Sequence, residues 1–379
     1  MKKRILFSFI CVALIVGAFS LCFGVVSQKQ KTSFDSGELA QYGEYKYYFS
    51  SLSEVEKQAY NCIIKEIESF PEKIKVPALD SEQLERVWCA VMYDNPELFM
   101  LGKECGVNTG IDGSWFYCDY VLDKVEYNEK KRQLDEKVSK AESEFSLLGT
   151  AFEKELYIHD LIVDGCTYVS PDKPMQSTAC GALLDGEASC EGYAKAAKTL
   201  LDAAEIENYL VCGTAMREDG SKEGHMWNIV VIDGEPYNLD VTWDDPLGEA
   251  LYDNKRYSYF NITDADIQKT HSFDSTPVGC ICVDENYFMK TGKLFDSYDA
   301  DMRTALAEVI AKESKSGKVD ICFSSDEVYK RAISGLFEKE DIYRVLEVAA
   351  LSSDVDFSTR QIKYINDDTH HILELILVS

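Results

Sequence analysis

The sequence predicts an α+β protein whose central part packs a helix against an antiparallel sheet. Apolar residues recur at helical spacing over residues 190–204. Two strand-like runs, residues 225–232 and 236–243, flank Asp233-Gly234, a dipeptide typical of tight hairpin turns. Further helical and strand-like segments lie on both sides of this central part. At 379 residues the chain is long enough for two or three folded units.

The first unit is predicted over residues 51–150, after a tether at residues 31–50. Apolar periodicity and β-branched or aromatic runs predict its elements. These are helices over residues 53–70, 81–93 and 128–148, and strands over residues 73–76 and 115–122. We expect a small α+β module that precedes the central unit.

A second flanking α+β module is predicted over residues 300–379. Its expected elements are a helix after residue 300, a strand at 319–323, one or two helices over 325–351 and two terminal strands. Both modules contain a strand, a Ser/Asp helix cap and an amphipathic helix. We therefore hypothesise that the two modules are related and pair with each other. The alternative is that any two short strand–cap–helix runs look alike.

Cys190 is predicted to lie in the first turn of the central helix. Unpaired backbone N–H groups and the positive end of the helix dipole lie there, and both favour a thiolate over a thiol. The same N–H groups could stabilise an oxyanion on a substrate carbonyl. Gly192 would destabilise an ordinary helix, so its presence predicts that another backbone segment comes close.

The hairpin places His225 and Asp240 on one face of the sheet. With Asp233 and Gly234 as the two turn residues, Trp227 lies opposite Asp240. His225 and Asp240 are then diagonal neighbours, ~7–8 Å apart at the backbone and within reach of each other's side chains. A four-residue loop preserves this parity and a three-residue loop breaks it. A carboxylate beside an imidazole can hold that imidazole as a base.

Three segments, Cys190–Ala194, His225–Asn228 and Asp240–Pro246, together resemble the core of the bacterial transglutaminase-like superfamily. The resemblance covers roughly residues 150–270 and implies a papain-like site within a catalytic domain, which we place at residues 151–299. It implies that Cys190 is the nucleophile, that His225 is the general base and acid, and that Asp240 orients His225.

The resemblance also implies the class of chemistry, which is acyl transfer through a thioester. Hydrolysis of a peptide or protein amide is the expected reaction, because water needs no second binding site. The superfamily contains peptidases, amidases, cross-linking enzymes and members without activity. The resemblance therefore leaves the acyl acceptor open, and a cross-linking transglutaminase and an inactive surface-binding module remain the alternatives.

Other residues have simpler interpretations. His159 lies in a helical run with apolar neighbours, and we interpret it as a core histidine. Trp227 and Trp243 are interpreted as core aromatics. Cys180 is a weaker rival nucleophile, because no helix start follows it. The nearest candidates for a second oxyanion donor are Gln176 and Tyr168, and their spacing does not decide between them.

No metal and no organic cofactor is predicted. Cys280 and Cys282, with His271 nearby, could suggest a metal ligand set, but one intervening residue is not the spacing of zinc knuckles. A buried strand is the preferred interpretation of that segment. The sequence also contains no phosphate-binding loop, no dinucleotide fingerprint and no His-Glu-x-x-His motif.

The N-terminal 30 residues predict export. Met1–Arg4 is basic, and residues 5–26 are 22 consecutive positions without a charged side chain. Such a segment fits a retained membrane anchor or a cleaved signal peptide. We expect an extracellular location, either anchored or secreted, with membrane contact through this segment only.

The net charge restricts the classes of binding partner that we expect, and the cysteine content bears on disulfide formation. The net charge of −27 disfavours binding to nucleic acid or to anionic lipid. The expected partner is a peptide or protein substrate at the cell surface or wall. The 13 cysteines are odd in number and irregular in spacing, which fits mostly free thiols better than a disulfide framework.

Overall fold

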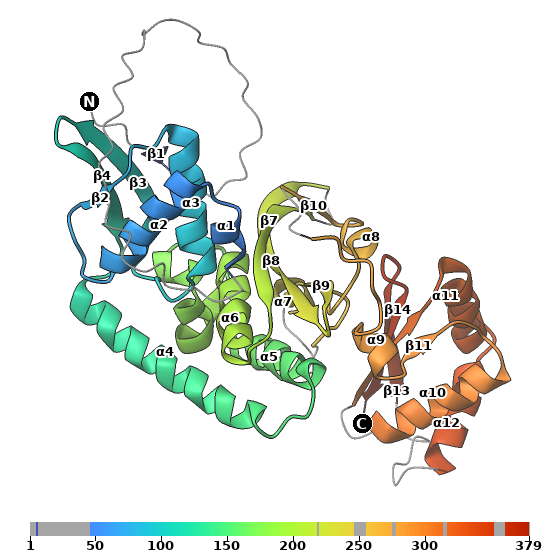
Figure 1. The fold of residues 1–379 in the computed structure, drawn as a ribbon. Coiled ribbons are helices and arrows are strands. Elements are labelled where there is room, and N and C mark those ends of the chain that lie inside the picture. The colour runs from blue at the N-terminus through green and yellow to red at the C-terminus, as the bar shows by residue number, and fades with distance from the viewer. Residues whose placement is uncertain are drawn as a thin grey trace, which may run out of the picture.

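The computed structural model describes residues 5–6, 46–217, 220–245, 255–274, 278–313, 317–351 and 361–378. It confirms the predicted α+β class, with helices packed on largely antiparallel sheets (Figure 1). Residues 7–45, which hold most of the predicted signal or anchor and tether, lie outside the described residues. Within the described ranges, every helix falls short of the length and apolarity that a membrane crossing requires.

The N-terminal unit contains the elements that periodicity predicts. Its sheet has the order β1-β3-β4-β2. The elements are β1 (Ile5–Leu6), α1 (Tyr47–Ser50), α2 (Glu54–Ile67), β2 (Ile74–Val76), α3 (Ser81–Asp94), β3 (Leu101–Gly110), β4 (Gly113–Tyr120) and α4 (Lys124–Phe145). Helix α4 begins four residues before the predicted start, because the Asp123 carboxylate caps it by accepting the N–H groups of Val125 and Glu126.

The central unit packs α6 against the sheet β10-β7-β8-β9. The Asn228 side-chain amide on β8 donates to the carbonyl of Ala194 on α6 at 3.1 Å and ties the two elements together. The longer elements are α5 (Ala151–Gly165), α6 (Cys190–Ala203), β7 (Asn208–Met216), β8 (Lys222–Ile232) and β9 (Glu235–Leu239). The short ones are β5 (Thr167–Tyr168), the 3₁₀ turn Pro174–Ser177, the π-turn Gly181–Asp185, β6 (Glu187–Ala188), α7 (Val241–Asp244), α8 (Asp264–Ile267), β10 (His271–Phe273) and α9 (Tyr287–Lys290).

The predicted hairpin register is confirmed. Asp233 and Gly234 both have positive φ, 53° and 86°, and Ile232 pairs with Glu235 across the turn. The second strand is shorter than predicted, because β9 ends at Leu239 and the next residues form α7. The cause is Asp240, whose Oδ1 accepts the N–H groups two and three residues later and starts a helix.

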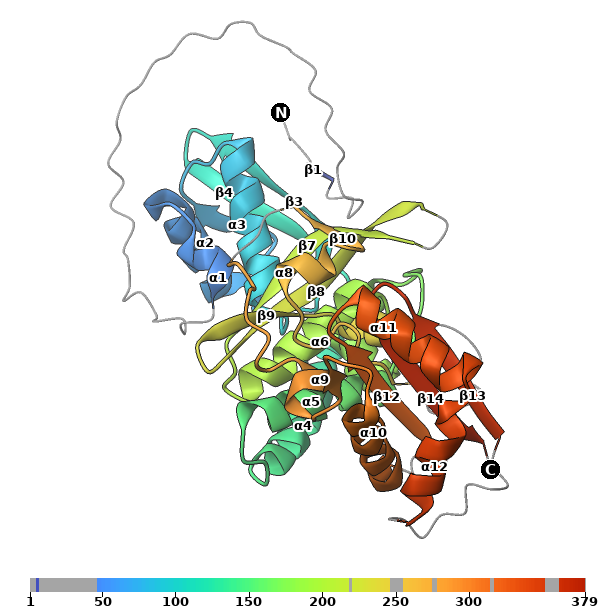
Figure 2. The same cartoon turned by 90° about the vertical axis from the view of Figure 1, so that its right-hand side faces the viewer.

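The C-terminal unit lies beside the central unit, and Figure 2 shows it from the side. Its sheet has the order β11-β12-β14-β13. Its elements are β11 (Leu294–Phe295), α10 (Ala300–Glu313), β12 (Lys318–Phe323), α11 (Asp326–Ile333), the π-turn Ser334–Glu338, α12 (Asp341–Leu351), β13 (Gln361–Asp367) and β14 (Ile372–Val378). The strand at 319–323, the pair of helices after it and the two terminal strands are confirmed.

The hypothesis that the two flanking modules are related and paired is wrong. Among the described strands, β2 lies at the edge of its sheet and pairs with β4 alone, whereas β12 lies inside its sheet between β11 and β14. The two strands belong to separate sheets on opposite sides of the central unit (Figure 1). A strand followed by a capped helix is a local pattern, and it does not determine which neighbours the strand acquires.

Buried apolar side chains connect the N-terminal and central units. One hydrophobic cluster contains Trp88 on α3, Phe116 on β4 and Tyr193 on α6. The Tyr48 hydroxyl also donates to the carbonyl of Leu210 on β7 at 2.7 Å. The C-terminal unit has its own cluster. The helix that begins with Cys190 packs against β7 and β8 of the central sheet and contacts α4 and α5.

Candidate active site

Cys190 is the first residue of α6, and Ser189 is the N-cap. The N–H groups of residues 190–192 have no carbonyl partner within the helix, because no earlier helical turn exists. The Ser189 N–H donates to the carbonyl of Gln176 at 2.8 Å, which fixes the chain before the helix. The predicted placement of the thiol at a helix start is confirmed.

Gly192 allows the loop at residues 176–178 to pass directly over the helix start. A Cβ at this position would lie 2.6 Å from the carbonyl oxygen of Gln176 and 2.7 Å from Cβ of Ala188. Both distances are shorter than real contacts permit. The predicted close approach of a second backbone segment is therefore confirmed, and Gly192 is required by this packing.

His225 and Asp240 meet on one face of the sheet, as the hairpin parity predicts. The His225 Nε2–H donates to Asp240 Oδ2 at 2.6 Å, and the two side chains are 3% and 0% exposed. Cys190 is close enough to this imidazole for its thiol to contribute to the raised pKa of His225. Since Nε2 is engaged by Asp240, Nδ1 is the nitrogen left for the thiol. The structure thus joins the three residues that the sequence singled out.

The electrostatics of this group favour a charged imidazole. Burial disfavours the charge on His225, but attraction to Asp240 and the contacts with Asp240 and Cys190 outweigh burial and raise its pKa to about 10. Burial likewise disfavours the Asp240 carboxylate. The neighbouring histidines, His225 and then His271, outweigh that penalty and hold the pKa of Asp240 well below its usual range.

The rival thiols lie in different surroundings. All cysteines in the described part of the chain are free, as the irregular spacing predicts. Cys180 is fully buried, and burial raises the pKa of its thiol to about 12. Burial raises the pKa of Cys89 and Cys212 to about 12 as well. These thiols are poor nucleophiles near neutral pH.

The two candidates for a second oxyanion donor, Gln176 and Tyr168, differ in whether their polar groups are already engaged in hydrogen bonds. Gln176 is buried, its Oε1 accepts the N–H groups of Asp172 and Lys173 at 2.9 and 3.1 Å, and its Nε2 lies 3.4 Å from Glu187 Oε2. These bonds occupy the amide in holding its own loop. Burial and then the nearby Cys190 raise the pKa of Tyr168 to about 12, so the phenol stays protonated close to the thiol.

His271, which the sequence associated only with Cys280 and Cys282, contacts Asp240 instead. It begins β10, and its Nε2 lies 3.2 Å from Asp240 Oδ2 with the side chain fully buried. Strand β7 explains the contact, since it pairs with β8 and β10 on its two edges, with Gly213 opposite His225 and Ala215 opposite His271. A hairpin-based prediction misses this, because β10 reaches the sheet from outside the hairpin. Cys280–Cys282 forms an irregular segment where a strand was preferred.

Among the described residues, His225, Asp240 and His271 form the cluster whose ligand atoms lie close enough together for one cation, within 4.8 Å of one another. Hydrogen bonding already engages two of the three side chains, His225 and Asp240. Asp240 Oδ2 accepts from His225, and Asp240 Oδ1 accepts from the N–H groups of Thr242 and Trp243. His225 and Asp240 thus form a hydrogen-bonded pair, and Nε2 of His271 lies 3.2 Å from the same carboxylate oxygen.

A pocket of about 320 Å³ opens beside the start of α6. It lies between the N-terminal unit and the loop before the 3₁₀ turn at Pro174–Ser177. Lys103, Lys173 and Lys195 line it together with Glu191, the residue after Cys190. Lys195 pairs with Glu191 at 2.8 Å and Lys103 lies 3.8 Å from the same carboxylate. The charged lining thus combines three lysines with two carboxylates, Glu191 and Asp172, and the lining does not include Cys190.

Residues 132–241, which include Cys190, His225 and Asp240, match the sequence profile of the transglutaminase-like superfamily. The chain carries a transglutaminase-like domain. The resemblance seen in the three motifs is thereby confirmed for this part of the chain. No curated protein sequence matches it.

Three solved structures are similar to parts of this chain. A candidate cysteine protease from Cytophaga hutchinsonii has 23% identity and a TM-score of 0.26, over 30% of this chain and 39% of that one. A protein described as a TGase has 16% identity and a TM-score of 0.26, over 46% and 51%. A candidate protease from Parabacteroides distasonis has 14% identity and a TM-score of 0.22, over 37% and 30%. The match therefore spans about half or less of each of these proteins.

Proposed function

We propose that this protein is a cysteine acyl-transfer enzyme that hydrolyses an amide of a peptide or protein through a thioester on Cys190. The observation that carries the proposal is the joining of three groups in one site. A thiol lies at a helix N-terminus, it is close enough to His225 to contribute to the raised pKa of that imidazole, and His225 donates to the buried carboxylate of Asp240. These are the three roles that nucleophilic catalysis by a thiol requires.

The reaction follows from the positions of the protons. His225 holds the proton of Cys190, and the thiolate attacks the amide carbonyl carbon, forming a C–S bond and an oxyanion. The C–N bond then breaks, and His225 gives its proton to the leaving amine. Water next attacks the thioester while His225 takes a proton from it. The C–S bond breaks, the carboxylic acid leaves, and the thiolate–imidazolium pair is restored.

The start of α6 supplies the groups that stabilise the oxyanion. The N–H groups of Cys190 and Glu191 point out of the helix without helical partners, and the helix dipole adds to their positive potential. Tyr168 is the favoured second donor, because its phenol stays protonated near the thiol while the Gln176 amide is engaged elsewhere. Such preorganised donors are typically worth 10²–10³-fold in rate.

The proposed substrate lies outside the cell. The basic N-terminus followed by 22 uncharged residues supports export, with the domain anchored at the membrane or secreted. The pocket beside Glu191, the residue after Cys190, supports binding of part of a peptide next to the site. The net charge of −27 supports a protein or peptide substrate over nucleic acid.

The decisive experiment is labelling of the purified protein with iodoacetamide across pH, with mass-spectrometric mapping of every cysteine. We expect Cys190 to label faster than the buried thiols, to keep labelling below pH 7, and to lose this preference in His225→Ala. Cys180 and Cys212 serve as internal controls, since their pKa values of about 12 predict slow labelling. Slow labelling of Cys190 at the same rate in the unmodified protein and in His225→Ala would contradict the proposal and favour a surface-binding module.

A further inference from the structure

We propose that His271 is a positioning residue of the site, a second imidazole that donates its Nε2–H to Asp240 Oδ2 and holds the carboxylate that orients His225. This inference rests on the proposed function, because it assigns a role within the same site. It extends the three-residue arrangement to a fourth side chain that no motif in the sequence indicates. The residue acts through Asp240 and does not touch the substrate.

The carboxylate of Asp240 is the meeting point of four groups. Oδ1 accepts the N–H groups of Thr242 at 3.0 Å and Trp243 at 3.2 Å. Oδ2 accepts from His225 at 2.6 Å and lies 3.2 Å from Nε2 of His271. A carboxylate has about four lone-pair sites, so these four groups match its whole capacity. In this structure the His271 ring is not aligned for a good hydrogen bond, and its Nε2 is otherwise unpartnered.

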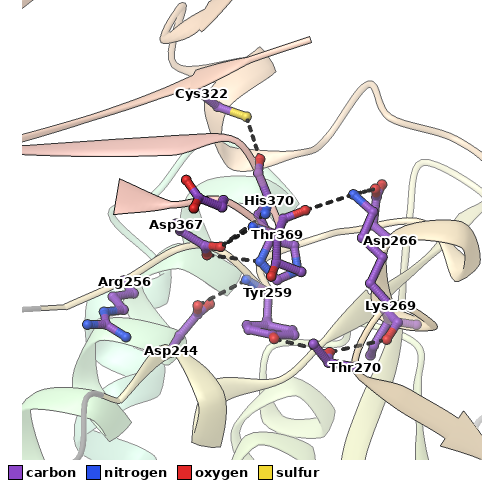
Figure 3. Close-up of polar contacts among 12 residues, drawn as sticks. Asp244, Arg256, Tyr259, Asp266, Lys269, Thr270, Cys322, Asp367, Thr369 and His370 are labelled. Carbon is purple, nitrogen blue, oxygen red and sulfur yellow. Dashed lines mark hydrogen bonds and ion pairs between the residues drawn. The ribbon is translucent and has the colours of Figure 1, made fainter. Parts of the chain in front are cut away.

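The neighbours of His271 decide which nitrogen carries the proton. Its Nδ1 lies 2.8 Å from Oγ1 of Thr270. Figure 3 shows that Thr270 hydroxyl beside the hydroxyl of Tyr259, and the two oxygens are 3.1 Å apart. If Nδ1 carried the only proton, a bare Nε2 would face the carboxylate 3.2 Å away and repel it. The Thr270 hydroxyl has two acceptors within reach, Nδ1 of His271 at 2.8 Å and the carbonyl of Ile267 at 3.4 Å. The proposed arrangement places its proton on the shorter contact, so that Tyr259 donates to Thr270, Thr270 donates to Nδ1, and Nε2–H points to Asp240.

The ring of His271 is fixed in place by aromatic side chains. Its centroid lies 4.6 Å from Trp243, 5.3 Å from Trp227 and 5.5 Å from Tyr259. The titratable groups that face it are Asp240, His225 and, through Thr270, Tyr259. Burial outweighs the attraction of Asp240 and lowers the pKa of His271, so the ring is a neutral donor at neutral pH.

The network continues into the C-terminal unit. Figure 3 shows Tyr259 beside His370, which lies in the turn between β13 and β14, and the two ring centroids are 4.7 Å apart. Asp367 accepts from the N–H and lies 2.9 Å from Nδ1 of His370, and Lys269 donates to the carbonyl of Thr369 at 3.2 Å. The turn between β13 and β14 thus packs against the ring of Tyr259. The Tyr259 hydroxyl in turn contacts the Thr270 hydroxyl, which determines which nitrogen of His271 carries the proton.

The test compares two substitutions of similar length. In His271→Gln the side-chain amide can still donate to Asp240, whereas His271→Met fills similar space without a donor. We expect both to lower the stability of the protein to a similar extent. We expect His271→Met to slow iodoacetamide labelling of Cys190 by roughly 10- to 100-fold, as loss of an orienting partner typically does, and His271→Gln to retain most of the labelling rate.

A second pair of variants, at Thr270, tests the same role if the substitutions of His271 prevent the protein from folding. Thr270→Ser keeps the hydroxyl that directs the His271 proton, and Thr270→Val removes it at nearly constant volume. We expect several-fold slower labelling in Thr270→Val only. Equal labelling within both pairs would overturn the role of His271. If the unmodified protein itself shows no preference for Cys190, the proposed function fails first, and that result is read independently of the variants.

Discussion

Two buried histidine–aspartate clusters share the short helix α7, and only one of them contains a thiol. Asp240 caps the helix and holds His225, while Asp244 ends the helix and lies 3.2 Å from Nε2 of His159 on α5. Cys190 lies close to His225, and Nδ1 is the ring nitrogen that Asp240 leaves available. The remaining nitrogen of His159, Nδ1, lies 3.0 Å from Asp160 instead. The prediction that His159 is a core histidine agrees with this arrangement.

The difference between the clusters lies in the second ring nitrogen. Burial disfavours the charged form of both histidines, yet their aspartates raise the pKa of His225 to about 10 and that of His159 to about 9. A raised pKa and a buried carboxylate therefore do not distinguish a catalytic histidine from a structural one. A free nitrogen directed at a nucleophile does, because a base must reach the proton that it removes.

The largest expected effect separates the two aspartates. Asp240→Asn removes the charge that stabilises the His225 imidazolium, so we expect Cys190 labelling and any amidase activity to fall by roughly 10²–10⁴-fold. Asp244→Asn changes a carboxylate of the same helix and leaves the His225 side untouched. We expect it to lower stability while the folded protein retains the labelling rate of Cys190. Similar losses of labelling in both variants would show that α7 acts as one unit.

The next effect concerns stability and pH. His159→Leu leaves the buried carboxylate of Asp244 without its imidazole partner, so we expect a loss of roughly 3–5 kcal/mol of unfolding free energy near neutral pH. The folded pKa of His159, about 9, lies above its usual value of 6.5. Its contribution is therefore complete below pH 6.5 and is lost as the pH rises through about 9.

Urea unfolding of the protein and of His159→Leu at pH 6 and pH 9.5 measures this contribution. The stability difference between them should shrink at the higher pH. A difference of the same size at both pH values would mean that His159 stabilises the fold through packing alone. Labelling of Cys190 in the folded variant should stay unchanged, which keeps this result separate from that for Asp240.

Local rules in the sequence predicted the parts of the site that local structure determines. The turn at Asp233-Gly234 fixes the hairpin register, and the register places His225 beside Asp240. The helical spacing after Cys190 and the placement of Gly192 predicted the helix start and its close backbone contact. Each of these follows from dihedral preferences or from side-chain periodicity within a short stretch of chain.

The parts that were missed depend on tertiary contacts. His271 reaches Asp240 only because β10 adds to the free edge of β7, and nothing near residue 271 in the sequence encodes that pairing. The composition of residues 241–243 predicts a strand, but these residues form the start of α7 because the Asp240 side chain is the N-cap of that helix. The edge position of β2 and the interior position of β12 were likewise set by distant partners.

The smallest expected effects come from removing the hydroxyl of either of two tyrosines, one beside each histidine–aspartate cluster. Tyr257 donates its hydroxyl to Asp160 at 3.1 Å on the His159 side, and the hydroxyl of Tyr259 contacts Thr270 on the His271 side. Replacing either by phenylalanine removes one hydrogen bond and keeps the ring, so each should cost about 1 kcal/mol of stability. Only Tyr259→Phe should also slow Cys190 labelling, by a few-fold, because Thr270 loses the donor that directs its own proton toward His271. If Tyr257→Phe slows labelling as much, the two clusters communicate through α7, and the proton network does not stop at Asp240.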